Sequence, residues 1–310
     1  MSLKKSDKIF IAGHTGMVGS ACWKRLSKVG YTNLVGKNSK ELDLRNQLEV
    51  ERFLATERPA AIIDAAARVG GILANKIFPY EFLMENLLIQ NNLIQVAHFL
   101  NIPKFIFLGS SCIYPKFAQQ PLKEEYLLTG RLETTNEGYA LAKITGVKLI
   151  EFLRKQYERD YLSLMPTNLY GPGDNFDLES SHVLPAMIRK FHEAKVNQHL
   201  TVNLWGTGSP FREFLHVDDL ASAVHFSLEN QLSESLYNVG SGVEISIKDL
   251  AALIQTIVGH KGEIHWDNTK PDGTPRKLLD SSKLKNLGWK ESISLGVGIN
   301  STYQDFLKMA

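Results

Sequence analysis

The sequence predicts an α/β protein with a doubly wound parallel sheet and a smaller C-terminal α/β lobe that binds substrate. Three observations support this fold class. Apolar, strand-like runs alternate with helical patterns through about residue 172, as in a right-handed parallel sheet. The first of these runs, Ile9–Ala12, leads directly into a glycine-rich turn. After Pro172 the pattern changes to a polar loop, 174–182, followed by shorter elements.

The glycine-rich turn at 13–19 joins the first strand to a helical pattern that continues to about Val29. A strand, glycines spaced G-x-x-G-x-x-G and a helix N-terminus form a site for a dinucleotide pyrophosphate. Small residues let the backbone come close to the ligand, and the free backbone amides donate hydrogen bonds to its phosphates. A tight turn without a ligand is the alternative. We therefore expect a Rossmann-like NADP-binding domain over 1–172, with 213–242 returning to it, and a lobe formed mainly by 173–310.

The other elements follow from hydrophobic patterns in chain order. Strands are expected at 33–35, 60–67, 104–109, 161–165 and 201–205, and helices at 79–100, 137–157, 183–194 and 247–258. The stretch 212–220 is expected to open a further helix, and a last helix is expected to end near Lys308.

Composition excludes several classes of protein. Hydrophobic residues make up 44% and charged residues 22% of the 310 residues, which is typical of an ordinary soluble globular protein. The net charge of +2 does not favour nucleic acid or a membrane surface, and no apolar run approaches the length of a membrane span. Cys22 and Cys112 give no disulfide framework, so a cytoplasmic location is expected. Cys22 is expected in the core.

Two lysines, Lys37 and Lys40, follow the second predicted strand. A carboxylate at that strand tip would bind the ribose 2′-hydroxyl of NAD, whereas basic residues suit the 2′-phosphate of NADP. No Asp or Glu occupies the tip, so the sequence favours NADP(H).

A tyrosine and a lysine four residues apart, Tyr139 and Lys143, share one face of the helix predicted at 137–157. An ammonium beside a phenol favours the phenolate, lowers the pKa of the phenol and makes it a proton carrier. Ser110 follows the buried strand predicted at 104–109, at the edge of the sheet where ligands bind. We expect these three residues in one site.

The glycine turn, Ser110 and the Tyr139/Lys143 pair resemble the extended short-chain dehydrogenase/reductase family. The runs SSCIYP (110–115), MPTNLYGP (165–172), REFLHVDD (212–219) and PDGTPRKLLD (271–280) narrow the resemblance to its GDP-sugar enzymes, over essentially the whole chain. The resemblance implies an NADP-dependent oxidoreductase and epimerase. Its expected reaction epimerises carbons three and five of GDP-4-keto-6-deoxy-D-mannose and reduces the 4-keto group with NADPH, which gives GDP-L-fucose.

The same resemblance implies a role for each catalytic residue. Cys112 is the base and His182 the acid of the epimerisation, and thiolates and imidazoles suit these roles because both titrate near neutrality. Ser110 and Tyr139 hydrogen-bond the oxygen on carbon four, and Tyr139 donates the proton in the reduction. Lys143 lowers the pKa of the tyrosine and binds the nicotinamide ribose. His216, by contrast, is expected to make structural hydrogen bonds.

The resemblance also implies the binding residues. Lys190 and Arg212 would bind the diphosphate of the GDP-sugar, and Trp205 and Asp272 complete the substrate site. No metal is expected. Relatives would carry arginines where Thr15 and Ser39 stand, so dual use of NAD remains an alternative. The implied cofactor contacts are Gly13, His14, Thr15, Gly16, Met17, Val18, Gly19, Lys37, Ser39, Asp43, Leu44, Leu108, Gly109, Lys143, Pro166, Thr167, Asn168, Leu169 and His182.

A sugar-nucleotide 4-epimerase, a 4,6-dehydratase and a non-catalytic dinucleotide-sensing module are the alternative functions. A sugar-nucleotide 4,6-dehydratase usually has Asp-Glu after the serine, where this chain has Cys112-Ile113, and a 4-epimerase needs no Cys/His pair. A non-catalytic module that senses dinucleotides could have lost Ser110, Tyr139 or Lys143, and all three are present. Relatives pair the helices corresponding to 79–100 and 137–157 into a four-helix bundle, which implies a homodimer.

Overall fold

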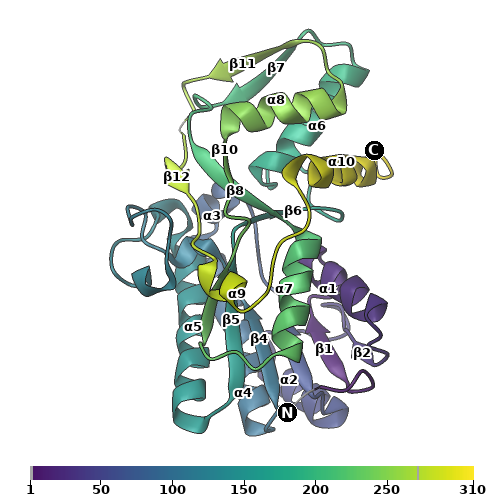
Figure 1. The fold of residues 1–310 in the computed structure, drawn as a ribbon, viewed down its shortest axis with the longest axis vertical. Helices are drawn as coiled ribbons and strands as arrows, with labels where there is room; N and C mark the ends of the chain where they lie inside the picture. The colour runs from purple at the N-terminus through teal and green to yellow at the C-terminus, as the bar shows by residue number, and fades with distance from the viewer. Residues whose placement is uncertain (1–2, 271) are drawn as a thin grey trace.

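The computed structural model describes residues 3–270 and 272–310 and contains a six-stranded parallel sheet below a smaller lobe (Figure 1). The strand order is β2-β1-β3-β4-β5-β9, and every neighbouring pair is parallel. This confirms the predicted fold class. The strands are β1 (Ile9–Ala12), β2 (Leu34–Val35), β3 (Ala61–Asp64), β4 (Lys104–Leu108), β5 (Asp160–Pro166) and β9 (Leu236–Val239).

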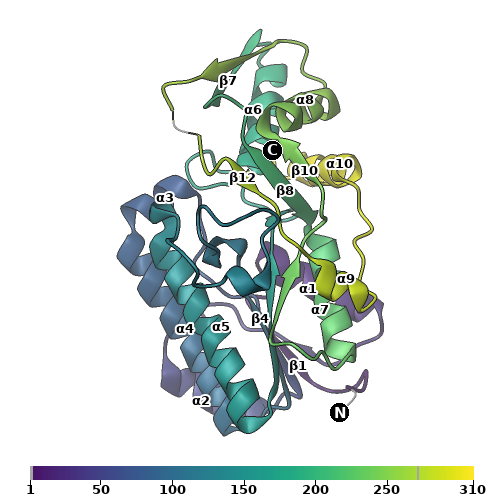
Figure 2. The same ribbon diagram turned by 60° about the vertical axis from the view of Figure 1, so that its left-hand side comes forward.

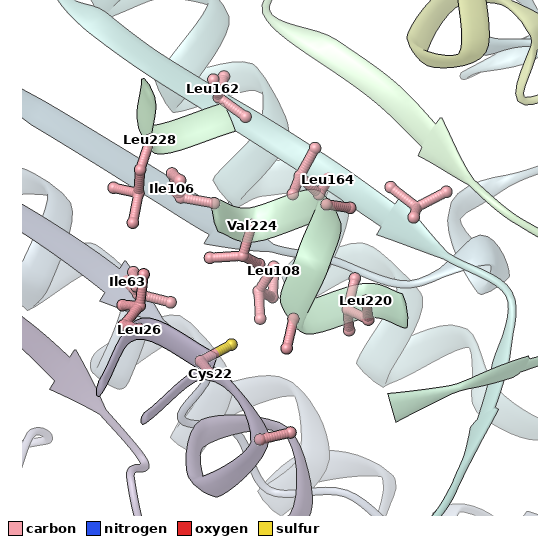
Figure 3. Packing of buried hydrophobic residues seen from close by; sticks show 14 of the residues in the cluster. Cys22, Leu26, Ile63, Ile106, Leu108, Leu162, Leu164, Leu220, Val224 and Leu228 are labelled. Carbon is pink, nitrogen blue, oxygen red and sulfur yellow. The ribbon is translucent and has the colours of Figure 1, made fainter. Parts of the chain in front are cut away.

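Helices cover both faces of this sheet, as its alternating side chains require. One core cluster joins one face of the sheet to α1 and α7. Figure 3 shows Cys22 and Leu26 of α1 in this cluster with Val224 and Leu228 of α7 and with strand residues such as Ile106. A second cluster joins the other face to α2, α4 and α5. These helices are α1 (Met17–Lys28), α2 (Gln47–Glu57), α4 (Pro79–Phe99), α5 (Glu137–Tyr157) and α7 (Val217–Glu229).

The smaller lobe has its own core, built from α6, α8, α10, β7 and β8. Its strand β8 pairs antiparallel with β10 and parallel with β12 and β6, while β11 pairs with β7. The strands are β6 (Asn168–Tyr170), β7 (Thr201–Trp205), β8 (Phe211–His216), β10 (Glu244–Ser246), β11 (Glu263–Asp267) and β12 (Arg276–Lys277). The helices are α6 (Val183–Val196), α8 (Ile247–Val258) and α10 (Leu295–Phe306).

Short elements connect these layers. Helix α3 (Ile72–Ile77) precedes α4, and α9 (Ser282–Asn286) lies beside β9 and α7 in Figure 2. Three 3-10 turns, η1 (Ser111–Ile113), η2 (Glu124–Tyr126) and η3 (Thr134–Asn136), lie between β4 and α5. No helix among the described residues has the length and apolar character needed to cross a lipid bilayer.

Two predicted elements are wrong in detail. The stretch 212–220 does not open as a helix, because residues up to His216 form β8, whose backbone is paired with β10 and β12, and α7 begins only at Val217. The strand predicted at 60–67 ends at Asp64, because the Asp64 Oδ1 accepts a hydrogen bond from the Ala66 N–H (3.2 Å) and the chain leaves the sheet there. Helices 137–157 and 247–258 match the prediction at both ends.

Candidate active site

The glycine turn after β1 has the geometry of a phosphate-binding loop. Gly13 has φ +76°, and a Cβ at Gly19 would lie 2.1 Å from the Gly13 carbonyl oxygen, so both positions need glycine. Helix α1 starts at Met17 with Gly16 as its N-cap, and no side chain of the described residues caps it. The first-turn N–H groups are therefore available to an anion, which the helix dipole also favours. This loop fits a dinucleotide pyrophosphate.

The segment after β2 is polar and tightly folded. Gly36 packs on the imidazole of His14, because a Cβ there would lie 2.3 Å from the ring. The Lys37 ammonium pairs with Glu41 at 3.2 Å, and both side chains are exposed. Such an exposed pair contributes little energy and opens easily toward a phosphate. Asp43, further along, pairs with Arg45 at 2.9 Å.

Lys143 lies buried on α5 against the end of β4. Its ammonium donates a hydrogen bond to the Leu108 carbonyl oxygen (2.9 Å) and lies 5.8 Å from the ring centre of Tyr139. Only 2% of Lys143 is exposed, and this burial lowers the pKa of its ammonium. The structure therefore brings together the Tyr139/Lys143 pair expected from the sequence.

The pKa of Tyr139 differs from the sequence prediction. Burial raises the pKa of its phenol well above the usual value, and the negative charges available on Cys112 and Asp64 raise it further. A net lowering of the pKa is wrong for this geometry, because desolvation of the phenolate outweighs any stabilisation by the Lys143 ammonium, which is hydrogen-bonded to the Leu108 carbonyl. The phenol is thus held protonated at neutral pH.

Asp64 is a site residue that the sequence reasoning missed. It is fully buried at the carboxyl end of β3, and its Oδ2 has no hydrogen-bond partner within the described residues. In the sheet it pairs in register with Phe107, whose ring lies 4.7 Å below the Lys143 ammonium. Burial raises the pKa of Asp64 to about 6, partly offset by Lys143. A lone carboxylate inside the apolar run AAIIDAAA was the available signal.

Ser110 and Cys112 emerge together from the end of β4. Ser110 is the N-cap of η1, and its Oγ accepts a hydrogen bond from the Cys112 N–H at 3.4 Å. Cys112 is 7% exposed, and burial raises the pKa of its thiol. The positive charge of Lys277, the hydrogen bond from Ser110 and the charge of Lys143 oppose that rise. Cys22, in contrast, is buried in the core on α1, as predicted.

His182 is the N-cap of α6 and closes the polar loop predicted at 174–182. His182 is an exposed residue by surface area, yet burial of its imidazole among protein atoms and the charge of Lys277 lower its pKa. The loop is held by Asp177, which accepts from the Ser180 N–H (3.0 Å), and by the Ser180 carbonyl, which accepts from Gly71 (2.9 Å). His216 instead caps α7 by accepting from the Asp218 N–H (3.2 Å), which confirms its structural role.

Four predicted substrate residues gather in the smaller lobe. The Lys190 ammonium donates to the Asn203 carbonyl (3.0 Å) and lies 5.9 Å from the ring of Trp205, which is 61% exposed. Asp272 accepts hydrogen bonds from the backbone and hydroxyl of Thr207. Burial lowers the pKa of Arg212, and the negative charge of Asp272 partly offsets this. The cluster groups two half-buried cations with an exposed aromatic face.

The other predicted cofactor residues lie at the ends of β4 and β5 and at the start of β6. Gly109 donates its N–H to the Leu164 carbonyl (3.0 Å), and a Cβ at Gly109 would lie 2.0 Å from Met165. Thr167 donates its N–H to Val239 (3.0 Å), and Asn168 donates its amide to the Glu213 carbonyl (2.8 Å). Pro166 is the last residue of β5, and Leu169 lies in β6.

Lys277 is the second residue that the sequence reasoning missed. It occupies β12, in register with Arg212 of β8. With Cys112 and Glu133 it lines a cavity of about 50 Å³. Its only sequence signal is its place in the run PDGTPRKLLD. A larger hollow of about 550 Å³ lies between 174–177, α6 and α10, and none of the predicted site residues lines it.

Comparison with known proteins identifies the family. The model of the NAD dependent epimerase/dehydratase family matches residues 9–240, three quarters of the chain. The protein therefore belongs to the NAD dependent epimerase/dehydratase family. It is 56% identical to GDP-L-fucose synthase 1 of Arabidopsis thaliana, over 98% of this chain and 94% of the relative. It is 51% identical to GDP-L-fucose synthase of Escherichia coli K12, over 97% of each chain.

Solved structures agree in fold over the full length. A GDP-6-OMe-4-keto-L-xylo-heptose reductase from C. jejuni superposes with a TM-score of 0.94 at 36% identity, covering 100% of both chains. A GDP-L-fucose synthetase from Naegleria fowleri bound to NADP superposes with a TM-score of 0.91 at 29% identity, covering 99% of this chain and 95% of the other. The similarity thus extends through the smaller lobe as well as the sheet.

Proposed function

We propose that this protein converts GDP-4-keto-6-deoxy-D-mannose into GDP-L-fucose by epimerising carbons three and five and then reducing the 4-keto group with NADPH. The observation that carries the proposal is the grouping of Cys112 with Ser110, Tyr139 and Lys143 around the end of β4, at the same edge of the parallel sheet as the phosphate-binding turn after β1. The 51–56% identity to GDP-L-fucose synthases over nearly the whole chain supports the substrate.

Cys112 and His182 are the proposed base and acid of the epimerisation. A ketone at carbon four acidifies the protons on carbons three and five, so a thiolate can remove them. The imidazole of His182 returns a proton from the opposite face of the sugar. The hydroxyls of Ser110 and Tyr139 stabilise the enolate by donating hydrogen bonds to its oxygen. The lowered pKa of His182 makes it a stronger acid once it is protonated.

Tyr139 is the proposed proton donor of the reduction. Bound NADPH supplies the hydride that carbon four receives. Because burial raises the pKa of Tyr139, the phenol is protonated at neutral pH and can deliver its proton to the oxygen on carbon four. Lys143 is proposed to bind the nicotinamide ribose and to stabilise the phenolate that remains after proton transfer, since its ammonium is close to the tyrosine ring.

The smaller lobe is proposed to bind the nucleotide part of the substrate. Lys190 and Arg212 would neutralise the diphosphate, because both cations lack a carboxylate within ion-pair distance among residues 3–270 and 272–310. Trp205 offers an exposed aromatic face, and Asp272 holds the loop at Thr207. The proposed division of the chain is 1–172 with 213–242 for the cofactor and the rest of 173–310 for the substrate.

The nineteen cofactor-binding residues named from the sequence remain the proposed contacts. The glycine turn and the strand ends around Gly109 and Thr167 support these contacts. The backbone packs closely at these places, and ligands of parallel α/β sheets bind at this edge of the sheet. Titrating the protein with NADPH and NADH, followed by cofactor fluorescence, measures the preference. Lys37→Met should weaken NADPH binding and leave NADH binding unchanged if Lys37 binds the 2′-phosphate.

A homodimer through a four-helix bundle is also proposed. Helices α4 and α5 lie side by side (Figure 2), and Gln90 of α4 donates a hydrogen bond to the Ala142 carbonyl of α5 (2.6 Å). Both helices expose large apolar side chains, including Met84, Leu88 and Phe152. Light scattering should give about twice the monomer mass of 34.8 kDa, and Met84→Lys should shift the measured mass toward that of the monomer.

A cytoplasmic location fits the two free cysteines.

The decisive experiment incubates the protein with GDP-4-keto-6-deoxymannose in deuterated water, with and without NADPH. Proton NMR should show deuterium at carbons three and five without NADPH, and GDP-fucose with it. Cys112→Ser should suppress the exchange, and Tyr139→Phe should lower the reduction about 10²- to 10⁴-fold. Cys22→Ala, in the core, is the matched control and should retain both activities. A wild-type protein without exchange or cofactor oxidation would refute the proposal.

A further inference from the structure

Lys277 places an ammonium beside the proposed base from a segment far away in the sequence. It lies in β12, whose register with β8 sets Lys277 opposite Arg212. The same lysine lines the cavity of about 50 Å³ that Cys112 and Ser111 border. Burial in this position lowers the pKa of the Lys277 ammonium, and the charge available on Cys112 raises it.

The other charges at this cavity are already paired. Lys116 pairs with Glu133 at 2.9 Å, and Arg276 pairs with Glu244 at 2.7 Å. Within the described part of the chain no carboxylate lies within 4 Å of the Lys277 ammonium. A half-buried cation without a carboxylate partner needs another anion nearby, because leaving it uncompensated is costly.

We propose that Lys277 is a positioning residue that stabilises the Cys112 thiolate and so sets the pH range in which this base removes the substrate protons. The inference rests on the proposed function, in which Cys112 is the base. The proton released on ionisation goes to water, and the thiolate then accepts a proton from carbon three or five. A cation close to a thiol is a general means of activating a cysteine.

The other ionisable groups around Cys112 do not replace this charge. Lys143 also favours the thiolate, but less than Lys277 does, and its ammonium is bound to the Leu108 carbonyl. Tyr139 is neutral, because its raised pKa keeps it protonated. The Lys116–Glu133 pair is internally neutral, and the positive charge of Lys277 disfavours protonation of His182. Lys277 therefore acts on both the proposed base and the proposed acid.

The test follows alkylation of Cys112 by iodoacetamide against pH, with peptide mass spectrometry as the readout. The chain has only two cysteines, and buried Cys22, whose pKa is raised to about 12, is the internal reference in the same sample. The midpoint of the pH profile reports the ionisation of Cys112, whereas a change in access alters only the plateau rate. No substrate or cofactor is needed, so the result is independent of the proposed reaction.

Lys277→Met should move the midpoint for Cys112 to higher pH and lower its alkylation rate at neutral pH about tenfold. Lys277→Arg keeps the charge and should restore the wild-type midpoint. The double variant Lys116→Met/Glu133→Gln, which removes both charges of the neutral pair in the same cavity, is the matched control and should leave the midpoint in place. Where iodoacetamide does not reach Cys112, the ultraviolet absorbance of the thiolate, with Cys112→Ser as the blank, gives the same midpoint. An unchanged midpoint in Lys277→Met would overturn the inference.

Discussion

Asp64 should make the stability of this protein depend on pH in a characteristic way. Burial raises the pKa of this carboxyl from 3.8 to about 6 in the folded protein. A folded-state pKa above the unfolded value means that the folded state binds the proton more tightly. The resulting stabilisation is fully present below the unfolded pKa and is lost as the pH rises through the folded one. The contribution of Asp64 to the stability of the protein therefore falls as the pH rises from about 4 to about 6.

The size of the effect follows from the shift. A change of about two units at 1.36 kcal/mol per unit corresponds to about 3 kcal/mol over the whole window, and about half of it falls above pH 5. Replacing Asp64 by Asn keeps the acceptor for the Ala66 N–H and removes the titration. The stability of Asp64→Asn relative to the wild type should thus rise by about 1.4 kcal/mol between pH 5 and pH 7.5.

Urea unfolding of both proteins at several pH values, followed by circular dichroism, measures this difference. Constant costs, such as the unpaired amide that Asn introduces, cancel because only the change with pH is compared. Asp64→Ala differs from Asp64→Asn in absolute stability but should share its dependence on pH. Parallel curves for the wild type and both variants would refute the reasoning, since they would show that Asp64 titrates at its ordinary pKa.

Two further predictions concern the glycine turn and the buried carboxylate of Glu213. Gly19→Ala should weaken NADPH binding at least tenfold in a fluorescence titration, because its Cβ would lie 2.1 Å from the Gly13 carbonyl, whereas Gly296→Ala, with no atom within 4 Å of the new Cβ, should bind normally. Glu213→Ala should lower the free energy of unfolding by about 1–3 kcal/mol in urea, because the buried N–H of Leu279 loses its acceptor and the Gly242 N–H loses its hydrogen bond. Glu213→Gln keeps one acceptor oxygen and should lose about half as much; equal stability of Glu213→Ala and the wild type would contradict the assignment.

Much of the fold could be predicted from the sequence because its signals are local. The strand Ile9–Ala12, the glycine turn and the helix after it are encoded within about twenty residues. Helix 137–157 is confirmed at both ends, since its apolar spacing and the Tyr139/Lys143 pair repeat at helical intervals. The alternation of these units is sufficient to predict a parallel sheet with helices on both faces.

Other features depend on segments that are distant in the chain. Residues up to His216 form a strand rather than a helix because they pair with β6, β10 and β12, which lie far away in the sequence. The pKa of Tyr139 is raised rather than lowered because burial on all sides, and not the neighbouring lysine, dominates. Pairwise spacing predicts which groups share a helix face but not how much water reaches them.

The sequence by itself determined the parallel α/β fold, the dinucleotide turn and the placing of Ser110, Cys112 and Tyr139 near one sheet edge. Only the tertiary structure brought Asp64 toward Lys143 and Lys277 toward Cys112. The physical reason is that backbone periodicity is fixed by neighbours along the chain. Burial, strand pairing and the electrostatic field at a site instead depend on residues that are distant in the chain and come into contact only after folding.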